Sequence, residues 1–388
     1  MQLDARVFLV GLFSRQRVHS FVASENMNNR YVVIMAGGRG ERFWPQSRLR
    51  RPKHLLPIVG DEPMLVQTVN RLGGLVPVEN VFVVTNSEQR DAVLETCPNL
   101  LPERVVGEPE GRDTAAAVAL SALLVQRENP SAAFAMLPAD HVIEDNAGFR
   151  TILDSAFEAA ETQDLLVTIG IRPTEPATGY GYIQRGEPCG EPGGRTLYNA
   201  VRFVEKPDRE TAESYVASGD YLWNAGMFVW RPEVILTAIA SHAPDLAKGI
   251  NALDDAWTEE ASLEEAMQSV YPTLTKISVD FAVMEKAENV AVLESAFDWD
   301  DVGEWPAIER HFPADEMGNV FRGAGLALES KGNVTYAEDG HLVALLGVDD
   351  LIVVQSADAT LVCRKDMAQG IKELTRKVVE VKDGEKLV

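Results

Sequence analysis

Short apolar runs alternate with amphipathic stretches along the first two thirds of the sequence. The apolar runs are rich in β-branched residues, as strands buried on both faces require, and they occupy residues 31–35, 81–85, 132–137 and 165–170. The stretches between them have helical periodicity and occupy residues 64–72, 114–126 and 149–162. This alternation predicts an α/β fold of the Rossmann-like, three-layer type, in which helices cover both faces of a mostly parallel sheet. Ligands bind beyond the carboxyl ends of the strands in such folds.

The pattern changes after about residue 312. Short apolar runs are then separated by residues that favour turns: Gly323, Gly332, Asn333, Asp339, Gly340, Gly347, Asp349 and Asp350. This pattern predicts a smaller β-rich domain, either a compact β-domain or a β-solenoid (β-helix). Residues 371–381 have the pattern of a closing helix. A chain of 388 residues is long enough for two domains. We therefore expect a larger domain at 27–312 and a C-terminal β-rich domain at 313–388.

The first 26 residues precede the first predicted strand. They contain one apolar run, residues 7–13, which is preceded by Asp4 and followed by Arg15 and Arg17. The run is too short to span a bilayer, and its flanks are poor for a signal peptide. We expect residues 1–26 to form a disordered extension; the alternative is a functional protein that begins at Met27.

The chain is strongly acidic, with 59 Asp and Glu residues against 36 Lys and Arg residues and a formal net charge of -23. Such a surface repels nucleic acid and anionic membranes, so we expect neither as a partner. A small anionic substrate would need a local group of positive charges. The three cysteines, Cys97, Cys189 and Cys363, are far apart and show no C-x-x-C spacing. They predict neither a disulfide framework nor a zinc site, and they fit a cytoplasmic protein.

A glycine-rich, basic segment directly follows the first predicted strand. Its glycines, Gly37, Gly38 and Gly40, allow backbone N–H groups to approach an anion closely. Between residues 39 and 54 the only acidic residue is Glu41, whereas six side chains are basic: Arg39, Arg42, Arg48, Arg50, Arg51 and Lys53. Arg and Lys are the side chains that bind phosphate, so this segment, residues 37–54 and called the basic loop below, predicts a phosphate site. A solvated surface loop is the alternative.

The basic loop fits neither of two common phosphate-binding motifs. The pattern G-x-x-x-x-G-K-[ST] is absent, which excludes a P-loop nucleotide hydrolase. The dinucleotide pattern G-x-G-x-x-G is also absent, because Phe43 stands where its third glycine would be.

An ordered series of motifs carries a resemblance to a known family. The basic loop reads Gly37-Gly38-x-Gly40-x-Arg42-Phe43-Trp44-Pro45-x-Ser47-Arg48, followed by Pro52-Lys53, and it resembles the signature of sugar-1-phosphate nucleotidylyltransferases. Its Phe-Trp-Pro-x-Ser-Arg variant is similar to the mannose-1-phosphate guanylyltransferase branch. Further segments follow in the order of that family, at residues 108–115, 137–141, 179–183, 203–207, 223–228, 278–285 and 299–305. The resemblance extends from about Tyr31 to the C-terminus.

The resemblance implies a nucleotidyltransferase that joins GTP and mannose 1-phosphate into GDP-mannose and releases pyrophosphate. Both substrates are anions, so the protein has to neutralise charge, align the reacting groups and place a metal ion. It also implies a single activity, because no sequence follows Val388 for the isomerase domain that some members carry. Pairing of the β-rich domain across a two-fold axis, which the family allows, predicts a homodimer.

The family positions assign one group of residues to the nucleotide. Backbone contacts are expected from Gly37, Gly38 and Gly40. Arg42 and Lys53 would bind the triphosphate. Glu108 would accept hydrogen bonds from the ring N–H and the amino group of guanine, and Arg112 would bind the nucleotide at its base or at a phosphate. The family has Asn where this chain has Asp113, and that departure bears on the base contacts.

A second group of residues is assigned to the sugar phosphate. Lys206, which follows a predicted strand at residues 201–204, would meet its phosphate, and we expect Lys206 to be catalytic together with Arg42, Lys53 and Asp140. Glu205 and Asn224 can hydrogen-bond to sugar hydroxyls. The glycines Gly179 and Gly181 would let the backbone approach the ring. A surface salt bridge for Lys206 and ordinary turns for the glycines are the alternatives.

Two aspartates are candidate ligands for Mg²⁺. Asp140 ends a buried strand, and Asp301 holds the Asp-x-Gly position of the family, with Asp300 beside it. Mg²⁺ prefers a few carboxylates together with phosphate oxygens and water, and His is a poor ligand for it. Carboxylates that only stabilise turns are the alternative.

Two other functions are left open by the sequence. A nucleotidyltransferase for another sugar 1-phosphate or another base would share most of these motifs. A non-catalytic regulatory paralogue would bind sugar nucleotides but should have lost a metal or phosphate residue. Arg42, Lys53, Asp140, Lys206 and Asp301 are all present.

Overall fold

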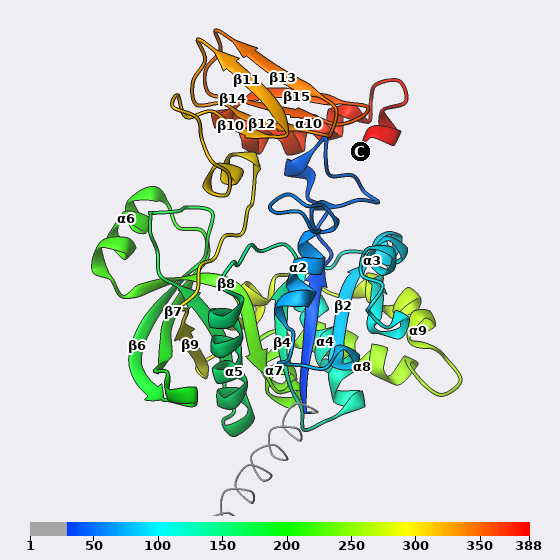
Figure 1. Cartoon of the computed structure of the whole chain (residues 1–388). Coiled ribbons are helices and arrows are strands. Elements are labelled where there is room, and N and C mark those ends of the chain that lie inside the picture. The colour runs from blue at the N-terminus through cyan, green and yellow to red at the C-terminus, as the bar shows by residue number, and fades with distance from the viewer. Residues whose placement is uncertain (1–28) are drawn as a thin grey trace, which may run out of the picture.

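A nine-stranded sheet forms the centre of the molecule in the computed structural model, which describes residues 29–388 (Figure 1). The strands lie in the order β3-β2-β1-β4-β8-β5-β9-β7-β6. Their bounds are β1 Arg30–Ala36, β2 Val81–Asn86, β3 Val105–Glu108, β4 Ala133–Pro138, β5 Leu166–Ile171, β6 Tyr182–Gly190, β7 Leu197–Val204, β8 Tyr221–Trp230 and β9 Val290–Glu294. The expectations for residues 1–26 lie outside the described residues.

Parallel and antiparallel pairing divide this sheet. β3, β2, β1 and β4 are parallel to one another, and so are β5 and β9. β8 runs antiparallel to both β4 and β5, while β6 and β7 form an antiparallel hairpin. The expected three-layer α/β fold is confirmed, but the sequence did not predict the antiparallel strands. A short connection through Pro192–Gly194 joins β6 to β7, and a connection of that length allows only antiparallel neighbours.

Helices cover both faces of the sheet (Figure 1). One face carries α2 (Met64–Arg71), α3 (Arg90–Thr96), α5 (Asn146–Thr162) and α6 (Arg209–Ser218). The other carries α4 (Asp113–Glu128), α7 (Pro232–His242), α8 (Pro244–Ala256) and α9 (Leu263–Val270). Along β1, Val32 and Ile34 face the first group and Tyr31 and Val33 face the second, as the two-residue period of a strand requires. Within residues 29–388, no helix combines the length and the apolarity needed to cross a membrane.

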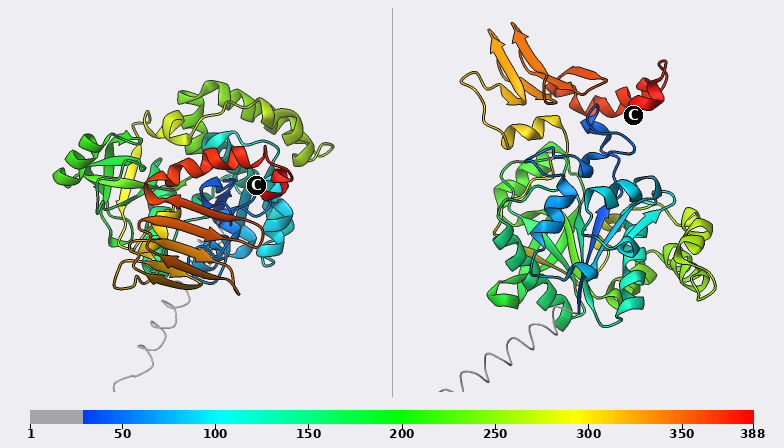
Figure 2. Two further views of the ribbon diagram at one scale, coloured as in Figure 1. Left: turned by 90° about the horizontal axis from the view of Figure 1, so that it is seen from above. Right: turned by 45° about the vertical axis from the view of Figure 1, so that its right-hand side comes forward.

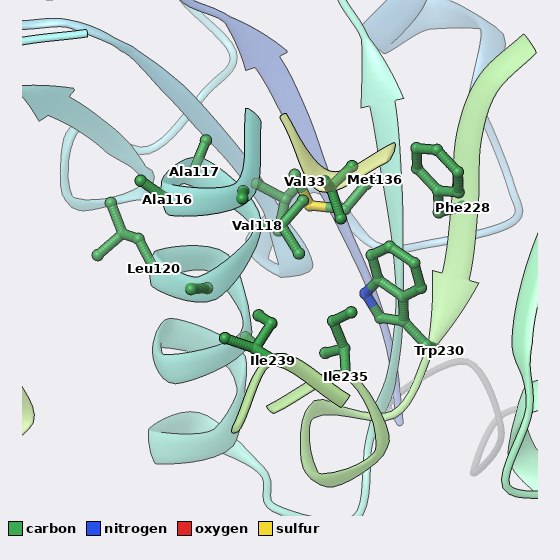
Figure 3. Packing of buried hydrophobic residues seen from close by; sticks show 14 of the residues in the cluster. Val33, Ala116, Ala117, Val118, Leu120, Met136, Phe228, Trp230, Ile235 and Ile239 are labelled. Carbon is green, nitrogen blue, oxygen red and sulfur yellow. The ribbon is translucent and has the colours of Figure 1, made fainter. Parts of the chain in front are cut away.

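Figure 3 shows the core on the α4 side of the sheet. Met136 and Trp230 project from the strands toward α4 and α7. Helix α4 is rich in alanine and buried from Ala115 to Val125, because the sheet covers one side of it and α7 and α8 cover the other. This packing fixes the N-terminus of α4 at the same edge of the sheet as the basic loop.

The C-terminal residues form a β-helix, one of the two architectures that the turn pattern allowed. β10 (Val320–Arg322), β12 (Val334–Ala337) and β14 (Leu351–Gln355) stack in parallel, and β15 (Thr360–Arg364) adds to this sheet in the antiparallel direction. β11 (Ala324–Leu328) pairs in parallel with β13 (Leu342–Leu346), and the closing helix is α10 (Ile371–Val378). Successive coils are linked by asparagines: Asn333 Nδ2 donates to Asn319 Oδ1 at 2.8 Å, and Asn333 Oδ1 accepts from the Leu351 N–H at 2.9 Å.

The β-helix packs on the basic loop of the same chain (Figure 2). A third apolar cluster joins Phe43 and Trp44 of the loop to Tyr336 of the β-helix through Trp305. Trp305 Nε1 donates to the Trp44 carbonyl at 3.1 Å, and Trp44 Nε1 donates to the Leu387 carbonyl at 2.6 Å. Fully burying a side chain such as Phe43 contributes about 1.5–3 kcal/mol, so the loop is held between the sheet and the β-helix.

Candidate active site

Two cavities open at the edge of the sheet where β1 and β4 end. The first, of about 490 Å³, includes most residues predicted for the nucleotide and the sugar: Gly37, Gly38, Glu108, Arg112, Gly179, Gly181, Glu205 and Asn224. The second, of about 470 Å³, includes the predicted phosphate and metal residues: Gly40, Arg42, Lys53, Asp140 and Asp301. His141 and Asp301 line both cavities and mark where they meet. Of the predicted site residues, all of which the structure describes, Lys206 alone lies outside both walls.

The glycines of the basic loop leave room for specific neighbours. Gly40 has a φ of +63°, and a Cβ there would lie 2.5 Å from Lys53 Cβ, so both its conformation and its packing favour glycine. A Cβ on Gly37 would lie 3.1 Å from Glu108 Oε2, whereas one on Gly38 would have no heavy atom within 4 Å. Gly37 and Gly38 therefore keep the floor of the first cavity open beside Glu108.

Lys53 joins the two candidate metal ligands. Its side chain is only 5% exposed, and its ammonium donates to Asp140 Oδ2 at 2.9 Å, to the Asp140 carbonyl at 3.1 Å and to the Asp301 carbonyl at 2.8 Å. An ammonium has three N–H donors, so these acceptors saturate it. The sequence assigned Lys53 to the triphosphate; a direct phosphate contact would require it to release one of these oxygens. As it stands, Lys53 positions both aspartates.

Asp140 lines the second cavity, and Asp301 lines both cavities. Burial opposes ionisation of Asp140, but the charge of Lys53, the charge of His141 and the hydrogen bond from Lys53 together outweigh it, and the pKa of Asp140 is lowered to about 2. Asp301 Oδ1 accepts from the Tyr180 hydroxyl at 2.9 Å and from the Gly303 N–H at 3.2 Å. Within residues 29–388, Asp301 Oδ2 has no hydrogen-bond donor. Asp140 is thus held ionised, and Asp301 presents a free oxygen.

Asp300 belongs to a separate network. It accepts from Arg310 Nη2 at 2.7 Å and from the Val302 N–H at 2.8 Å, and His311 Nε2 lies 2.8 Å from its Oδ2. Burial raises the pKa of Asp300, but the hydrogen bonds from His311, Arg310 and Val302 hold it well below its usual range. Asp300 therefore stabilises the turn that presents Asp301 to the cavities.

These groups fit a magnesium ion. Within residues 29–388, no three or more His, Cys, Asp or Glu side chains cluster as a complete metal site. Mg²⁺ is usually bound by one or two carboxylates with substrate phosphates and waters completing its shell. The two aspartates that line the second cavity, Asp140 and Asp301, match that requirement.

The end of the first cavity that was expected to take the base is built around Glu108 at the end of β3. Its carboxylate accepts from the Tyr271 hydroxyl, and burial raises its pKa to about 7 against the opposing effect of that hydrogen bond. The N-terminus of α4 lines the same cavity through Asp113 and Thr114. Arg112 Nη2 donates to Glu110 at 2.9 Å and also to the Pro272 carbonyl, so this nitrogen of the guanidinium is already engaged.

The end of the first cavity that was expected to take the sugar contains several polar side chains in contact with one another. A Cβ on Gly181 would lie 2.5 Å from Glu205 Oε2, so glycine is needed for Glu205 to reach the cavity. Asn224 Nδ2 donates to Asp280 Oδ1 at 3.0 Å. Burial and the neighbouring charge of Glu205 raise the pKa of Asp280 to about 6. Lys206, whose side chain is 62% exposed, donates to Glu205 Oε1 at 2.6 Å from just outside the cavity.

Sequence reasoning gave no role to Asp280 and Tyr180, two polar residues that line the first cavity. Asp280 stands in the segment 278–285 and Tyr180 stands between Gly179 and Gly181, so both lay inside motifs that were recognised. Neither received a role, because the signal for each is its contact with a distant partner: Asn224 for Asp280, and Asp301 for Tyr180.

Comparison with known proteins agrees with this architecture. The nucleotidyl transferase family profile matches residues 31–317, and the profile described as MannoseP isomerase/GMP-like beta-helix domain matches residues 323–378. A mannose-1-phosphate guanylyltransferase of Klebsiella pneumoniae is 40% identical over 343 residues, which cover 88% of this chain and 72% of the relative. A mannose-1-phosphate guanylyltransferase of Escherichia coli (strain K12) is 38% identical over 352 residues, which cover 90% of this chain and 73% of that relative.

A solved structure shows the same fold over nearly the whole chain. The crystal structure described as mannose-1-phosphate geranyltransferase from Thermus thermophilus superimposes with a TM-score of 0.80 at 38% identity. The match covers 91% of this chain and 100% of that one. With both profiles matched in order and relatives of this identity along most of its length, the chain belongs to the mannose-1-phosphate guanylyltransferase family of nucleotidyltransferases.

Proposed function

We propose that this protein transfers the guanylyl group of GTP to mannose 1-phosphate, giving GDP-mannose and pyrophosphate. The observation that best supports the proposal is the junction at Asp301, where a cavity with base and sugar residues meets a cavity with phosphate-binding residues. The names of the relatives point to the same pair of substrates. We further propose a cytoplasmic location, because the three cysteines are free thiols.

The chemistry asks for alignment and charge neutralisation. An oxygen of mannose 1-phosphate attacks the α-phosphorus of GTP, a new P–O bond forms, and the bond to the β-phosphate breaks as pyrophosphate leaves. Arg42 lines the second cavity, is exposed and, among the described residues, has no ion-pair partner, so it is available to the triphosphate. Asp140 and Asp301 would hold Mg²⁺, which when bound neutralises phosphate charge. Lys53 keeps the two aspartates in place while the substrates exchange.

The two ends of the first cavity would set specificity. Glu108 in its ionised form can accept from the ring N–H and the amino group of guanine. Glu205, Asn224 and Asp280 can bind sugar hydroxyls at the opposite end. Lys206 is exposed and flexible enough to exchange Glu205 for the phosphate of the sugar. A nucleotidyltransferase for another sugar or base would bind its substrates in the same two cavities. A regulatory paralogue would not need the complete set of charged residues that line them.

Our first prediction concerns the substrates. Purified protein with Mg²⁺ should release pyrophosphate fastest from GTP with mannose 1-phosphate, in a coupled assay over a grid of nucleoside triphosphates and sugar 1-phosphates. Much faster turnover of another pair, such as UTP with glucose 1-phosphate, would show that the substrates are wrong. No turnover of any pair would favour the regulatory paralogue.

The second prediction concerns the metal. Chelation should abolish turnover, and Asp140→Asn and Asp301→Asn should each lower kcat by roughly 100-fold or more, because each removes a charge from the reaction centre. Asp300→Asn should instead lower the melting temperature with a much smaller fall in kcat, because Asp300 bonds to Arg310 rather than to the cavity. A larger kcat effect at position 300 than at 301 would contradict the assignment.

The third prediction uses the pKa of Glu108, which burial raises to about 7. As pH falls from 8 to 6, the carboxyl gains a proton and loses its capacity to accept from guanine, so the KM for GTP should rise. Glu108→Gln should raise this KM roughly 10-fold or more at pH 8, the scale of a hydrogen bond to a charged group, and should remove the contribution of Glu108 to the pH dependence. The same pH profile in both proteins would remove Glu108 from base recognition.

We also propose that residues 313–388 support a homodimer. The β-helix packs on its own basic loop through one side, and the pair β11 and β13 presents an apolar face on another. The exposed fractions on this face are 51% for Leu326, 60% for Leu328, 63% for Leu342 and 69% for Leu346. A second copy of the same face would cover these side chains around a two-fold axis.

The fourth prediction tests this dimer. Light scattering on the full chain should give twice the chain mass, and the double substitution Leu326→Lys with Leu346→Lys should give a folded, active monomer. Val362→Lys, on the other sheet of the β-helix and 60% exposed in the structure, is the matched control and should remain dimeric. A wild-type protein that is monomeric at micromolar concentration would exclude the dimer.

A further inference from the structure

The C-terminal β-helix domain contributes one side chain to the second cavity. Most of the second cavity is formed by the basic loop and by the segments around Asp140 and Asp301, but Lys372 of α10 also lines it. Ile371, the preceding residue, is 2% exposed in the apolar cluster that holds the basic loop. The anchored neighbour fixes the backbone of α10, so the ammonium of Lys372 is held within reach of the cavity.

The charges of this cavity show why one more cation matters. Its basic residues are Arg39, Arg42, Lys53 and Lys372, and its acidic residues are Glu41, Asp140 and Asp301. Lys53 is saturated by oxygens at positions 140 and 301. That leaves Arg39, Arg42 and Lys372 to meet a group that arrives as triphosphate and leaves as pyrophosphate.

Lys372 is restrained only weakly in the structure. Its Nζ lies 3.6 Å from Glu41 Oε2, and the two side chains are 53% and 31% exposed. An ion pair of this exposure contributes little, so a phosphate group of higher charge can displace Glu41. Lysine suits such an exchange because its ammonium is a point charge on a flexible stem.

We propose that Lys372 binds the β- and γ-phosphates of the nucleotide and the pyrophosphate that they become, exchanging Glu41 for these groups. The inference rests on the proposed function and adds a catalytic residue to it. Lys372 stabilises negative charge on the leaving group as the bond between the α- and β-phosphates breaks, and it is neither consumed nor deprotonated in that step. The β-helix therefore takes part in the reaction as well as in packing of the basic loop.

The test is Lys372→Met in the full chain, assayed in both directions. In the reverse reaction, from GDP-mannose and pyrophosphate, the KM for pyrophosphate should rise roughly 10-fold or more, the scale of a lost charge-assisted hydrogen bond. In the forward reaction kcat/KM for GTP should fall, while the KM for mannose 1-phosphate and the melting temperature should stay unchanged. Lys372→Arg should restore part of the loss, because it keeps the charge.

Lys377→Met is the matched control. Lys377 stands on the same helix, is 65% exposed and pairs with Glu380 at 3.1 Å, away from the cavity, so its loss should leave every constant unchanged. Equal effects at 372 and 377 would mean that only the net charge of α10 matters and would overturn the proposal. So would a Lys372→Met protein that binds pyrophosphate with wild-type affinity.

Calorimetric titration of Mg²⁺ and pyrophosphate into the protein separates this proposal from the proposed function. Wild type should bind pyrophosphate at least roughly 10-fold more tightly than Lys372→Met, whichever nucleotide or sugar is the true substrate. If GTP with mannose 1-phosphate is not the preferred pair but the difference in pyrophosphate affinity is still found, only the proposed substrates are wrong. An active enzyme without the difference would refute the role of Lys372 alone.

Discussion

The contact between Lys53 and the two aspartates is the interaction on which the active site depends. The ammonium of Lys53 links the end of β4 to the segment after β9. These two segments are far apart in the sequence and come together only in the folded chain. Removing Lys53 would leave the Asp140 carboxylate without its neutralising partner and the Asp301 carbonyl without its donor. Gly40 is needed for the same contact, because a side chain at this position would collide with Lys53. Within the basic loop, Gly40 makes room for Lys53, Lys53 holds Asp140 and Asp301, and Arg39 and Arg42 line the second cavity.

The β-helix explains how so open a loop keeps its shape. A glycine-rich segment loses much conformational entropy on ordering, and the basic loop is ordered by burial of Phe43 and Trp44 in the apolar cluster that Trp305 shares with the β-helix. The same packing places α10 beside the second cavity. Catalytic and C-terminal parts therefore share one apolar cluster, and a substitution in that cluster should disturb both stability and phosphate binding.

Features encoded locally could be predicted from the sequence, and features that depend on distant partners could not. The apolar runs predicted β1, β2, β4 and β5 within a residue or two, because buried strands need continuous apolar sequence. Turn residues between short apolar runs indicated the β-rich C-terminal domain, because each turn is also encoded by its own residues. The antiparallel course of β8 was missed, since its sequence does not reveal which strands it lies between. For the site, the motifs supplied nearly every residue of the cavity walls. They did not reveal the contacts that Lys53 and Asp280 make with distant segments, and they did not include Lys372 of α10.

We propose that Asp140 and Asp301 bind one metal ion where the two cavities meet. The most direct test is anomalous scattering from Mn²⁺ in crystals of the protein grown with GDP-mannose, since Mn²⁺ shares the oxygen ligands of Mg²⁺. We expect one strong anomalous peak within coordination distance of both carboxylates and of the phosphates of the nucleotide. A peak bound to the phosphates but to neither aspartate, or one at Asp300, would contradict this proposal.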